Sequence, residues 1–262
     1  MTTVRTRREP PSFRTVAVVG TEALTPRLVR VTVGGDEMAG LTLDRPAASV
    51  RLLLPPPGHR DLVMPTWDGN EFLMPDGSRP VLRTLTPRRV DPAARTLDVE
   101  VVVHDGGALT AWATAAQPGD AVAVSGPGRG YAIDPEATDH LLAGDETALP
   151  AIGQLLEHLP AGRPVRVLVE VADPSARLPL PERVRPEVTW LDLPPGAAPG
   201  TALVEAVGAA EIGPGTRVWV AGEAAAVQRI RRRLLQERGI PRSQTEIRGY
   251  WRNGRAGEGA GG

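Results

Sequence analysis

The sequence contains no cysteine and no lysine, and it has only four histidines and few aromatic residues. Without cysteine the chain cannot form disulfides, thiolate nucleophiles, cysteine zinc sites or iron–sulfur clusters, because each of these needs sulfur. The four scattered histidines add no convincing redox-metal site, so we predict no bound metal. If this chain moves electrons, it must use an organic cofactor.

An excess of one charge and a long apolar run are also missing. The 30 basic and 31 acidic residues leave a net charge of −1, whereas binders of nucleic acids or anionic membranes need excess positive charge. No run approaches the roughly 18 apolar residues of a membrane span, and the first ten residues lack the apolar core of a signal peptide. We therefore expect a soluble, cytoplasmic protein with no nucleic-acid partner and no stable membrane association. The oligomeric state stays open, and nothing in the sequence demands more than a monomer.

The length of 262 residues favours two compact domains. Short apolar or alternating runs in the first half predict six strands, with one short helical segment at 109–116. This pattern indicates an antiparallel barrel or sandwich. A stretch rich in proline, glycine and aspartate at 55–80 is too long for an ordinary connection. The predicted strands are 14–19, 27–33, 49–54, 81–88, 96–103 and 120–125.

After residue 135 strands alternate with helices, which indicates an α/β domain with a parallel sheet. The predicted helices cover 146–158, 201–208 and 223–238. The predicted strands cover 140–143, 165–171, 187–191, 217–221 and 245–250.

Two motifs in the first half suit a phosphate. Arg83 and Arg88 stand in a polar run on a predicted strand, and a guanidinium offers paired donors to phosphate oxygens. Gly106 and Gly107 come just before the short helix, whose free N–H groups favour an anion. Taken alone, the arginine motif is also compatible with an exposed strand whose charges are solvated. The glycine motif is also compatible with a plain turn.

Three motifs in the second half lie at strand ends. Residues 141–150 and 218–223 each run from a strand through a glycine into a helix, where open α/β sheets bind nucleotides. Neither contains G-x-G-x-x-G or the lysine of a P-loop. Residues 249–252, Gly-Tyr-Trp-Arg, close the last strand and either seal the domain or line a flat aromatic ligand.

These motifs, in this order, resemble the siderophore-interacting protein family, whose members are flavin-dependent ferric-siderophore reductases of the ferredoxin-reductase-like superfamily. The resemblance covers nearly the whole chain. Its most specific pieces are Arg83-x-x-Thr86-x-Arg88, Gly144-Asp-Glu-Thr-Ala-Leu-Pro-Ala151, Ala221-Gly-Glu223 and Gly249-Tyr-Trp-Arg252.

The resemblance implies a two-domain ferredoxin-reductase-like fold. Residues 11–134 would form a six-stranded antiparallel β-barrel that binds FAD. Residues 135–262 would form a Rossmann-like α/β domain with a parallel sheet that binds NADPH or NADH. The implied catalytic residue is Thr86, close to flavin N5, and Arg83 would hold the FAD pyrophosphate. The other implied cofactor contacts are Thr84, Leu85, Arg88, His104, Gly107, Ala108, Leu109, Thr110, Gly144, Glu146, Thr147, Ala148, Gly222, Glu223 and Trp251.

The implied reaction passes a hydride from NADPH or NADH to FAD and then single electrons to ferric iron in a siderophore, which releases ferrous iron. Because ferric chelates are often anionic, arginines would attract the substrate. Positions in the family pattern nominate Arg51, Arg129, Arg248 and Arg252.

The chain departs from the family pattern at two places. The family usually has tyrosine at Leu85, so stacking along the flavin would be lost, although leucine can still cover an apolar ring. Residues 107–110 read Gly-Ala-Leu-Thr where many relatives read Gly-Pro-Ala-Ser, and both keep a hydroxyl at the fourth position. Two alternatives stay open: a flavin reductase with a quinone, dye or protein acceptor, and a siderophore-binding protein that has lost flavin.

The choice between the two nicotinamide coenzymes also stays open. Glu170, near the end of the second strand of the α/β half, favours a free ribose. Arg177, a few residues later, can reach a 2′-phosphate. The two cues conflict.

Overall fold

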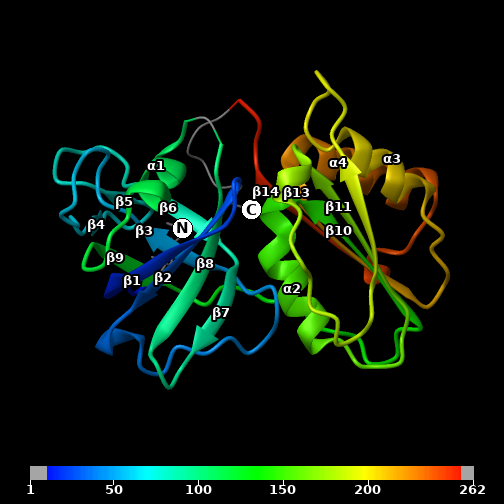
Figure 1. Ribbon diagram of the computed structural model, residues 1–262, viewed down its shortest axis with the longest axis horizontal. Coiled ribbons are helices and arrows are strands. Elements are labelled where there is room, and N and C mark those ends of the chain that lie inside the picture. Colours follow the sequence, from blue (N-terminus) through cyan, green and yellow to red (C-terminus); the bar gives the residue numbers. More distant parts are fainter. Residues whose placement is uncertain (1–10, 105, 255–262) are drawn as a thin grey trace, which may run out of the picture.

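The computed structural model describes residues 11–104 and 106–254, which form two lobes lying side by side (Figure 1). One lobe contains an antiparallel sheet, and the other contains a parallel sheet with helices, so the predicted fold class is confirmed. Residue 105 of the predicted first domain and residues 255–262 of the second lie outside the described residues.

The first lobe is one curled sheet of seven strands in the order β6-β3-β9-β1-β2-β8-β7. All neighbours pair antiparallel. Only Thr86 separates β6 from β7 in sequence, yet they lie at opposite ends of this order, so the chain itself joins the two edges. The strands are β1 (Arg14–Thr25), β2 (Leu28–Gly34), β3 (Val50–Leu53), β6 (Leu82–Leu85), β7 (Pro87–Asp91), β8 (Thr96–Val102) and β9 (Ala121–Ser125).

The seventh strand arises because the predicted strand 81–88 is interrupted at Thr86. Pro87 has no N–H to donate to a ladder, and proline is tolerated at the first residue of a strand, which is where it begins β7. The pairing of β7 with β8 also shifts register between Pro87 and Arg89. The interruption places Thr86 at the point where the chain passes from one edge of the sheet to the other.

The interior of the barrel is filled by alternate apolar side chains such as Val31, Leu52 and Val99, all essentially inaccessible to solvent. Helix α1 (Ala108–Ala115) packs Trp112 and Ala113 against this core. A short helical turn, η1 (Asp36–Met38), follows β2.

The long segment at 55–80 contains a small hairpin that the sequence did not predict, β4 (Thr66–Trp67) paired with β5 (Phe72–Leu73). Its aromatic rings pack together. Trp67 and Phe72 have ring centroids 4.8 Å apart, and Phe13 lies 5.3 Å from Phe72.

The second lobe is a parallel sheet in the order β12-β11-β10-β13-β14. The strands are β10 (Asp139–Asp145), β11 (Val165–Val171), β12 (Glu187–Asp192), β13 (Thr216–Glu223) and β14 (Thr245–Trp251). The strand order reverses between β10 and β13, and ligands of open α/β sheets bind at such a switch point, at the carboxyl ends of the strands.

Helices cover both faces of this sheet (Figure 1). The helix predicted at 146–158 begins as a 3-10 turn, η2 (Glu146–Ala148), before α2 (Leu149–His158). The helix predicted at 223–238 is α4 (Ala224–Arg232), followed by the π-helical turn η4 (Arg233–Glu237). The other helical elements are α3 (Thr201–Ala209), η3 (Pro174–Ala176) and η5 (Arg242–Gln244). None of the described helices is long and apolar enough to cross a membrane.

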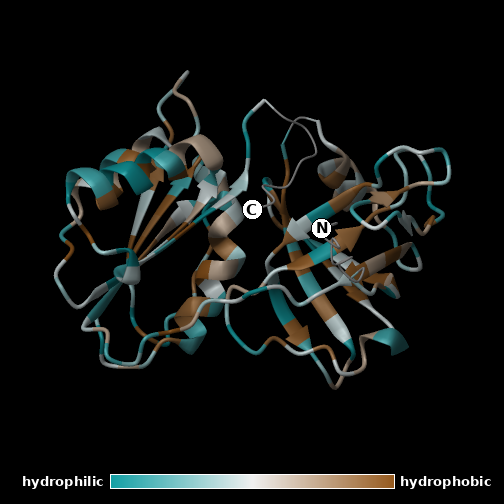
Figure 2. Cartoon of the chain, turned by 180° about the vertical axis from the view of Figure 1, so that it is seen from behind, coloured by the Kyte–Doolittle hydropathy of each residue, from teal (hydrophilic) through white to brown (hydrophobic). Residues whose placement is uncertain are grey.

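Helix α2 stands between the two lobes, and much of it is coloured white to brown in Figure 2. Eight of its ten residues are buried. Its Gln154 contacts the barrel directly: Oε1 accepts from the Ala47 N–H at 2.7 Å, and Nε2 donates to the Pro87 carbonyl at 2.6 Å. The helix therefore joins the lobes as well as covering the sheet.

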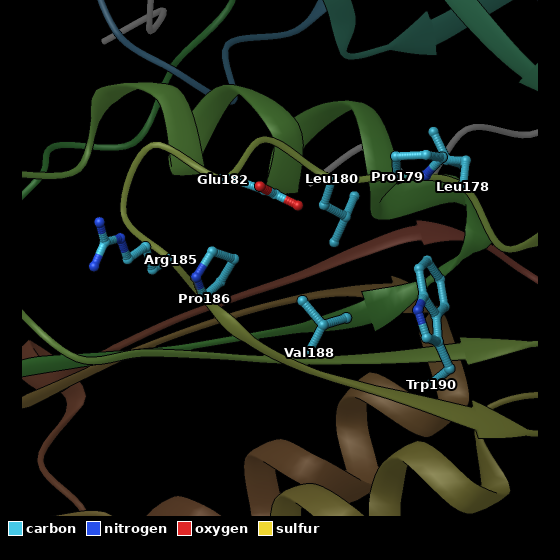
Figure 3. Close-up of a pocket in the computed structure, with 8 residues that line it drawn as sticks. All are labelled: Leu178, Pro179, Leu180, Glu182, Arg185, Pro186, Val188 and Trp190. Atoms are coloured by element: carbon cyan, nitrogen blue, oxygen red, sulfur yellow. The ribbon is translucent and has the colours of Figure 1, made fainter.

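The crossover from β11 to β12 carries only the turn η3, and a proline-rich loop replaces the usual helix. A cavity of about 370 Å³ lies between this loop and the edge strand β12, below α2 (Figure 3). Its lining residues are Leu178, Pro179, Leu180, Glu182, Arg185, Pro186, Val188 and Trp190.

Candidate functional site

The site is built where the end of β6 meets the carboxyl end of the parallel sheet. Thr86 is 8% exposed, and its Oγ1 lies 3.2 Å from the hydroxyl of Tyr250 near the end of β14. The residue predicted as catalytic thus lies at the domain junction, in contact with the C-terminal motif.

Arg83 carries a partly buried positive charge on β6. It pairs in register with the buried Leu52, and burial lowers the pKa of its guanidinium below the ordinary value. Within the described chain Nη1 donates to the Leu82 carbonyl at 3.0 Å, and no carboxylate pairs with the guanidinium. An uncompensated cation of this kind suits a phosphate.

The neighbours of Arg83 alternate between two environments. Thr84 is exposed and pairs in register with the exposed Arg51 on β3, so one predicted cofactor contact and one predicted substrate contact share a face. Leu85 is partly buried against the barrel core and pairs with Val50. Leu85 therefore packs against the barrel core and also lies next to Thr86 in the sequence.

The start of α1 forms the second phosphate-compatible element. Gly107 is the N-cap with φ 96°, and no side chain among the described residues caps the helix. The positive φ favours glycine at this position, and a Cβ at Gly107 would make a tight contact of 3.3 Å with the His104 ring. The first-turn N–H groups, from Ala108 to Thr110, are left to bind an anion, while the Thr110 hydroxyl donates to the Val102 carbonyl at 3.4 Å.

These features test the fit of FAD to the barrel. A partly buried guanidinium without a carboxylate and an uncapped helix start are what a pyrophosphate needs. The residues present therefore fit the group. Arg88, in contrast, is occupied by α2: its Nη2 and Nη1 lie 2.6 and 3.1 Å from the Glu157 carboxylate.

Asp145 organises the switch point. Its buried carboxylate accepts four hydrogen bonds, from the N–H and hydroxyl of Thr147 at 2.9 and 2.5 Å, the Glu223 N–H at 2.9 Å and the Trp251 indole at 2.8 Å. Burial raises the pKa of Asp145, and these donors oppose that shift. One carboxylate thus ties together the ends of β10, β13 and β14.

Two glycines make this packing possible. A Cβ at Gly222, where φ is 155°, would lie 2.6 Å from Asp145 Oδ2, and a Cβ at Gly144 would lie 2.4 Å from the Ala148 Cβ. Both glycines, which were predicted to contact the dinucleotide, are therefore needed for the close approach of the strand ends. Ala148 itself is fully buried.

The two glutamates of the predicted nucleotide motifs also accept hydrogen bonds from protein donors. Glu146 accepts from Arg27 of the barrel at 3.1–3.2 Å and from the Ala172 N–H at 2.6 Å. Glu223 caps α4 through the Ala226 N–H at 2.8 Å. Of the predicted residues on the β10 and β13 loops, Thr147 is the one that is partly exposed.

Glu170 and Arg177, the two residues considered for the choice between NADH and NADPH, have different environments in the structure. Glu170 is buried and caps α3, accepting from the Gly200 and Leu203 N–H groups at 2.5 and 3.0 Å, so it is not available to a ribose. Arg177 is accessible after η3 and pairs with Asp192 at 2.5 Å. The ribose cue is therefore removed, and a 2′-phosphate at Arg177 would have to replace Asp192 as the partner of the guanidinium.

The four arginines nominated for the substrate fall into two groups. Arg51, Arg129 and Arg252 are exposed. Arg248 instead crosses the junction and donates to the carbonyls of Ala47, Arg129 and Gly130 at 3.1–3.4 Å, and to Glu246 at 2.8 Å. The structure therefore brings Arg248 next to the Arg129 backbone and uses its donors to hold that loop.

Several residues of the site were not predicted. Asp145 stands inside a quoted motif, but its role depends on donors from three segments. The sequence does mark Gln154, because it is a polar residue in an otherwise apolar helical segment and a buried polar group needs hydrogen-bond partners. No local pattern marks Arg27, because its partner Glu146 is 119 residues away in the sequence.

Comparisons with known proteins give the same picture. Residues 17–131 match the siderophore-interacting FAD-binding domain, and residues 137–254 match siderophore-interacting protein. A siderophore utilization protein from T. fusca is 41% identical, with a TM-score of 0.83 over 95% of this chain and 96% of that one. A ferredoxin NADP+ reductase from Neisseria gonorrhoeae is 14% identical, with a TM-score of 0.63 over 91% of this chain and 99% of that one, which shows the fold alone.

Two curated relatives have named activities. The NADPH-dependent ferric-chelate reductase of Escherichia coli is 30% identical over 91% of this chain and 92% of its own length. The ferric vibriobactin reductase of Vibrio cholerae is 29% identical over 87% of this chain and 85% of its own length. With both halves matched and relatives aligned over nearly their full length, the chain belongs to the siderophore-interacting protein family.

Proposed function

We propose that the protein transfers electrons from NADPH, through FAD, to ferric iron held by a siderophore. The observation that carries this proposal is the contact of Thr86 with Tyr250, which joins the FAD-binding half to the C-terminal edge of the parallel sheet. A flavin along β6 would then lie within reach of a dinucleotide at the switch point.

The barrel residues would bind and orient FAD. Arg83 and the first turn of α1 would hold the pyrophosphate, and the Thr86 hydroxyl would hydrogen-bond flavin N5. When bound, FAD supplies the passage from a two-electron donor to one-electron acceptors. Thr147 would face the dinucleotide, and Arg177 would exchange its partner Asp192 for the 2′-phosphate. The NADPH-dependent relative from Escherichia coli supports NADPH over NADH.

Exposed cations would attract the substrate. Arg51, Arg129 and Arg252 would face an anionic ferric chelate, while Arg248 holds the Arg129 loop in place. Iron is the substrate here, and its reduction weakens chelation by hard oxygen ligands. We place this reaction in the cytoplasm, where reduced nicotinamide nucleotides are supplied, and we propose a monomer because one chain provides both cofactor-binding halves.

Visible absorption of the purified, FAD-incubated and desalted protein tests the proposal. Flavin bands should bleach anaerobically with NADPH and return with a ferric siderophore, while a ferrous trap develops colour. Equal turnover with a quinone or dye and none with the chelate would favour a general flavin reductase. A colourless protein that still binds the chelate would instead favour a flavin-free binder, with Leu85 as the first residue to examine.

A further inference from the structure

Two hydroxyl groups meet across the domain junction, and either can be the donor. Thr86 Oγ1 and the Tyr250 hydroxyl are 3.2 Å apart, and this is the hydrogen bond that each makes among residues 11–104 and 106–254. Because an O–H can both donate and accept, the pair has two orientations: Tyr250 donates to Thr86, or Thr86 donates to Tyr250.

The strand end holds the phenol firmly in place. β14 pairs with β13 through Gly249 and then Trp251, so Tyr250 is the extra residue of a bulge, a device that re-aims side chains near functional sites. The Tyr250 ring packs against Trp219 with centroids 6.4 Å apart at 78°. The next residue, Trp251, is bound to Asp145 at 2.8 Å.

The two orientations match what flavin N5 requires. N5 has no hydrogen in oxidised FAD and accepts a hydrogen bond, whereas in reduced FAD it carries one hydrogen and donates. The hydride from NADPH brings two electrons and that hydrogen. The electrons leave singly to two ferric ions, and the N5 proton is released to solvent. A group that contacts N5 in both states must therefore reverse its role.

We propose that Tyr250 is a positioning residue that acts through Thr86 and lets its hydroxyl serve both oxidation states of the flavin. With oxidised FAD, Tyr250 donates to Thr86 and Thr86 donates to N5. With reduced FAD, N5–H donates to Thr86, and the Thr86 proton needs an acceptor, which is the Tyr250 oxygen. This inference rests on the proposed function, because it assumes that FAD lies against Thr86.

The protonation state of the phenol suits this role. Burial raises the pKa of Tyr250 above its ordinary value, although the Thr86 hydrogen bond and the charge of Arg248 oppose the shift. The phenol therefore stays neutral at physiological pH and keeps both a donor and an acceptor. A phenolate could only accept, and it would fix the chain of hydroxyls in one direction.

Tyr250→Phe tests the inference, with Tyr131→Phe as the matched control. Tyr131 is the only other tyrosine of the chain, and it is buried in the same core cluster that Tyr250 packs against. Among the described residues the Thr86 hydroxyl is hydrogen-bonded to Tyr250, not to Tyr131. The readouts are the dissociation constant of oxidised FAD and the midpoint potential of the bound flavin against reference dyes.

Tyr250→Phe should leave the affinity for oxidised FAD within about twofold, because Thr86 can still donate to N5. It should weaken reduced FAD relative to oxidised FAD about tenfold, since a buried hydroxyl then lacks its acceptor. For a two-electron couple this lowers the potential by about 30 mV. In a Thr86→Val background the same change should have no further effect.

A shift no larger than that of Tyr131→Phe, or an equal shift in the Thr86→Val background, overturns the inference. Because wild-type protein is measured first, the two failures are distinguishable. A wild-type protein that retains no FAD overturns the proposed function and this inference together. A wild-type protein that retains FAD, with a Tyr250→Phe potential unchanged, overturns the inference alone.

Discussion

Arg83 holds a positive charge that the described protein does not neutralise, and a phosphate would pair with it. Replacing this residue, as Arg83→Gln, removes a charge-assisted interaction of about 1.5–3 kcal/mol. We expect the dissociation constant of FAD to rise about 10- to 100-fold in a flavin fluorescence titration. Arg89→Gln is the control, because Arg89 is an exposed side chain on the following strand. Equal weakening in both variants would show that net charge, not a specific contact, is responsible.

His140 gives a prediction for the pH dependence of stability. It is 1% exposed at the start of β10, and burial lowers its pKa, with Asp134, Asp139, Arg163 and Arg217 as the nearby charges. The unfolded chain therefore binds the proton more readily, so His140 stabilises the fold above its unfolded pKa of about 6.5 and loses this contribution as pH falls toward its folded pKa.

Urea unfolding of wild type and His140→Gln between pH 5 and 8 checks this sign. The free energy of unfolding of the wild type should fall more steeply below about pH 6.5 than that of the variant. Comparing the two proteins removes the contribution of the carboxylates that they share. Parallel curves would mean that His140 takes up its proton equally well in the folded state.

Single-residue roles were predictable where local sequence decides them. The glycine pair marks the start of α1 from local sequence alone. Thr86 was singled out by the resemblance to the siderophore-interacting proteins, and the strand period did not place it at the junction. The role of Asp145 was not predictable, because its four donors come from Thr147, Glu223 and Trp251. Residues that looked like dinucleotide contacts, such as Glu146 and Glu223, turn out to be bound by protein donors for the same reason.

Whole elements were predictable where hydrophobic periodicity runs long enough. β11 has the predicted bounds, and α3 differs from its prediction by one residue. β4 and β5 were missed because two-residue strands show no period, and their pairing depends on Trp67 and Phe72. The interruption at Thr86 could have been read from Pro87, which cannot donate to a ladder.

Helix α2 gives a prediction at the scale of an element, because Gln154 fixes it to the barrel. Gln154→Met would leave the Ala47 N–H and the Pro87 carbonyl without partners, at about 1–3 kcal/mol for each buried group. We expect urea unfolding to show a loss of about 2–5 kcal/mol. Gln236→Met, at an exposed position, should change stability by less than about 0.5 kcal/mol. Similar losses in both variants would deny Gln154 this role.

At the scale of the whole molecule, the two lobes are tied by contacts that span long stretches of sequence. Arg27 binds Glu146, Arg88 binds Glu157, and Arg248 reaches three carbonyls on the barrel side. None of these partners is specified by local pattern, so the sequence predicted two domains and did not predict how they are joined. The site depends on this joining, because Thr86 and Tyr250 come from different lobes.

The Arg27–Glu146 pair should therefore govern whether the lobes unfold together. The Glu146 side chain is 7% exposed, so Arg27→Gln leaves a buried carboxylate without its cation, at about 3 kcal/mol or more. Arg30→Gln is the matched control, because Arg30 pairs within the barrel lobe with Glu100, whose side chain is 2% exposed, and with the exposed Glu22. Calorimetry of the wild type should show one transition.

Both variants should melt earlier, by about 6–12 °C for a loss of about 3 kcal/mol in a protein of this size. Only Arg27→Gln should divide the transition in two, because it weakens the junction, whereas Arg30→Gln weakens one lobe and leaves the junction intact. A single transition in Arg27→Gln would mean that the remaining contacts, through Gln154 and Glu157 of α2 and through Arg248, are sufficient to couple the lobes. The flavin and dinucleotide halves would then be held together by those contacts, not by the ion pair at the switch point.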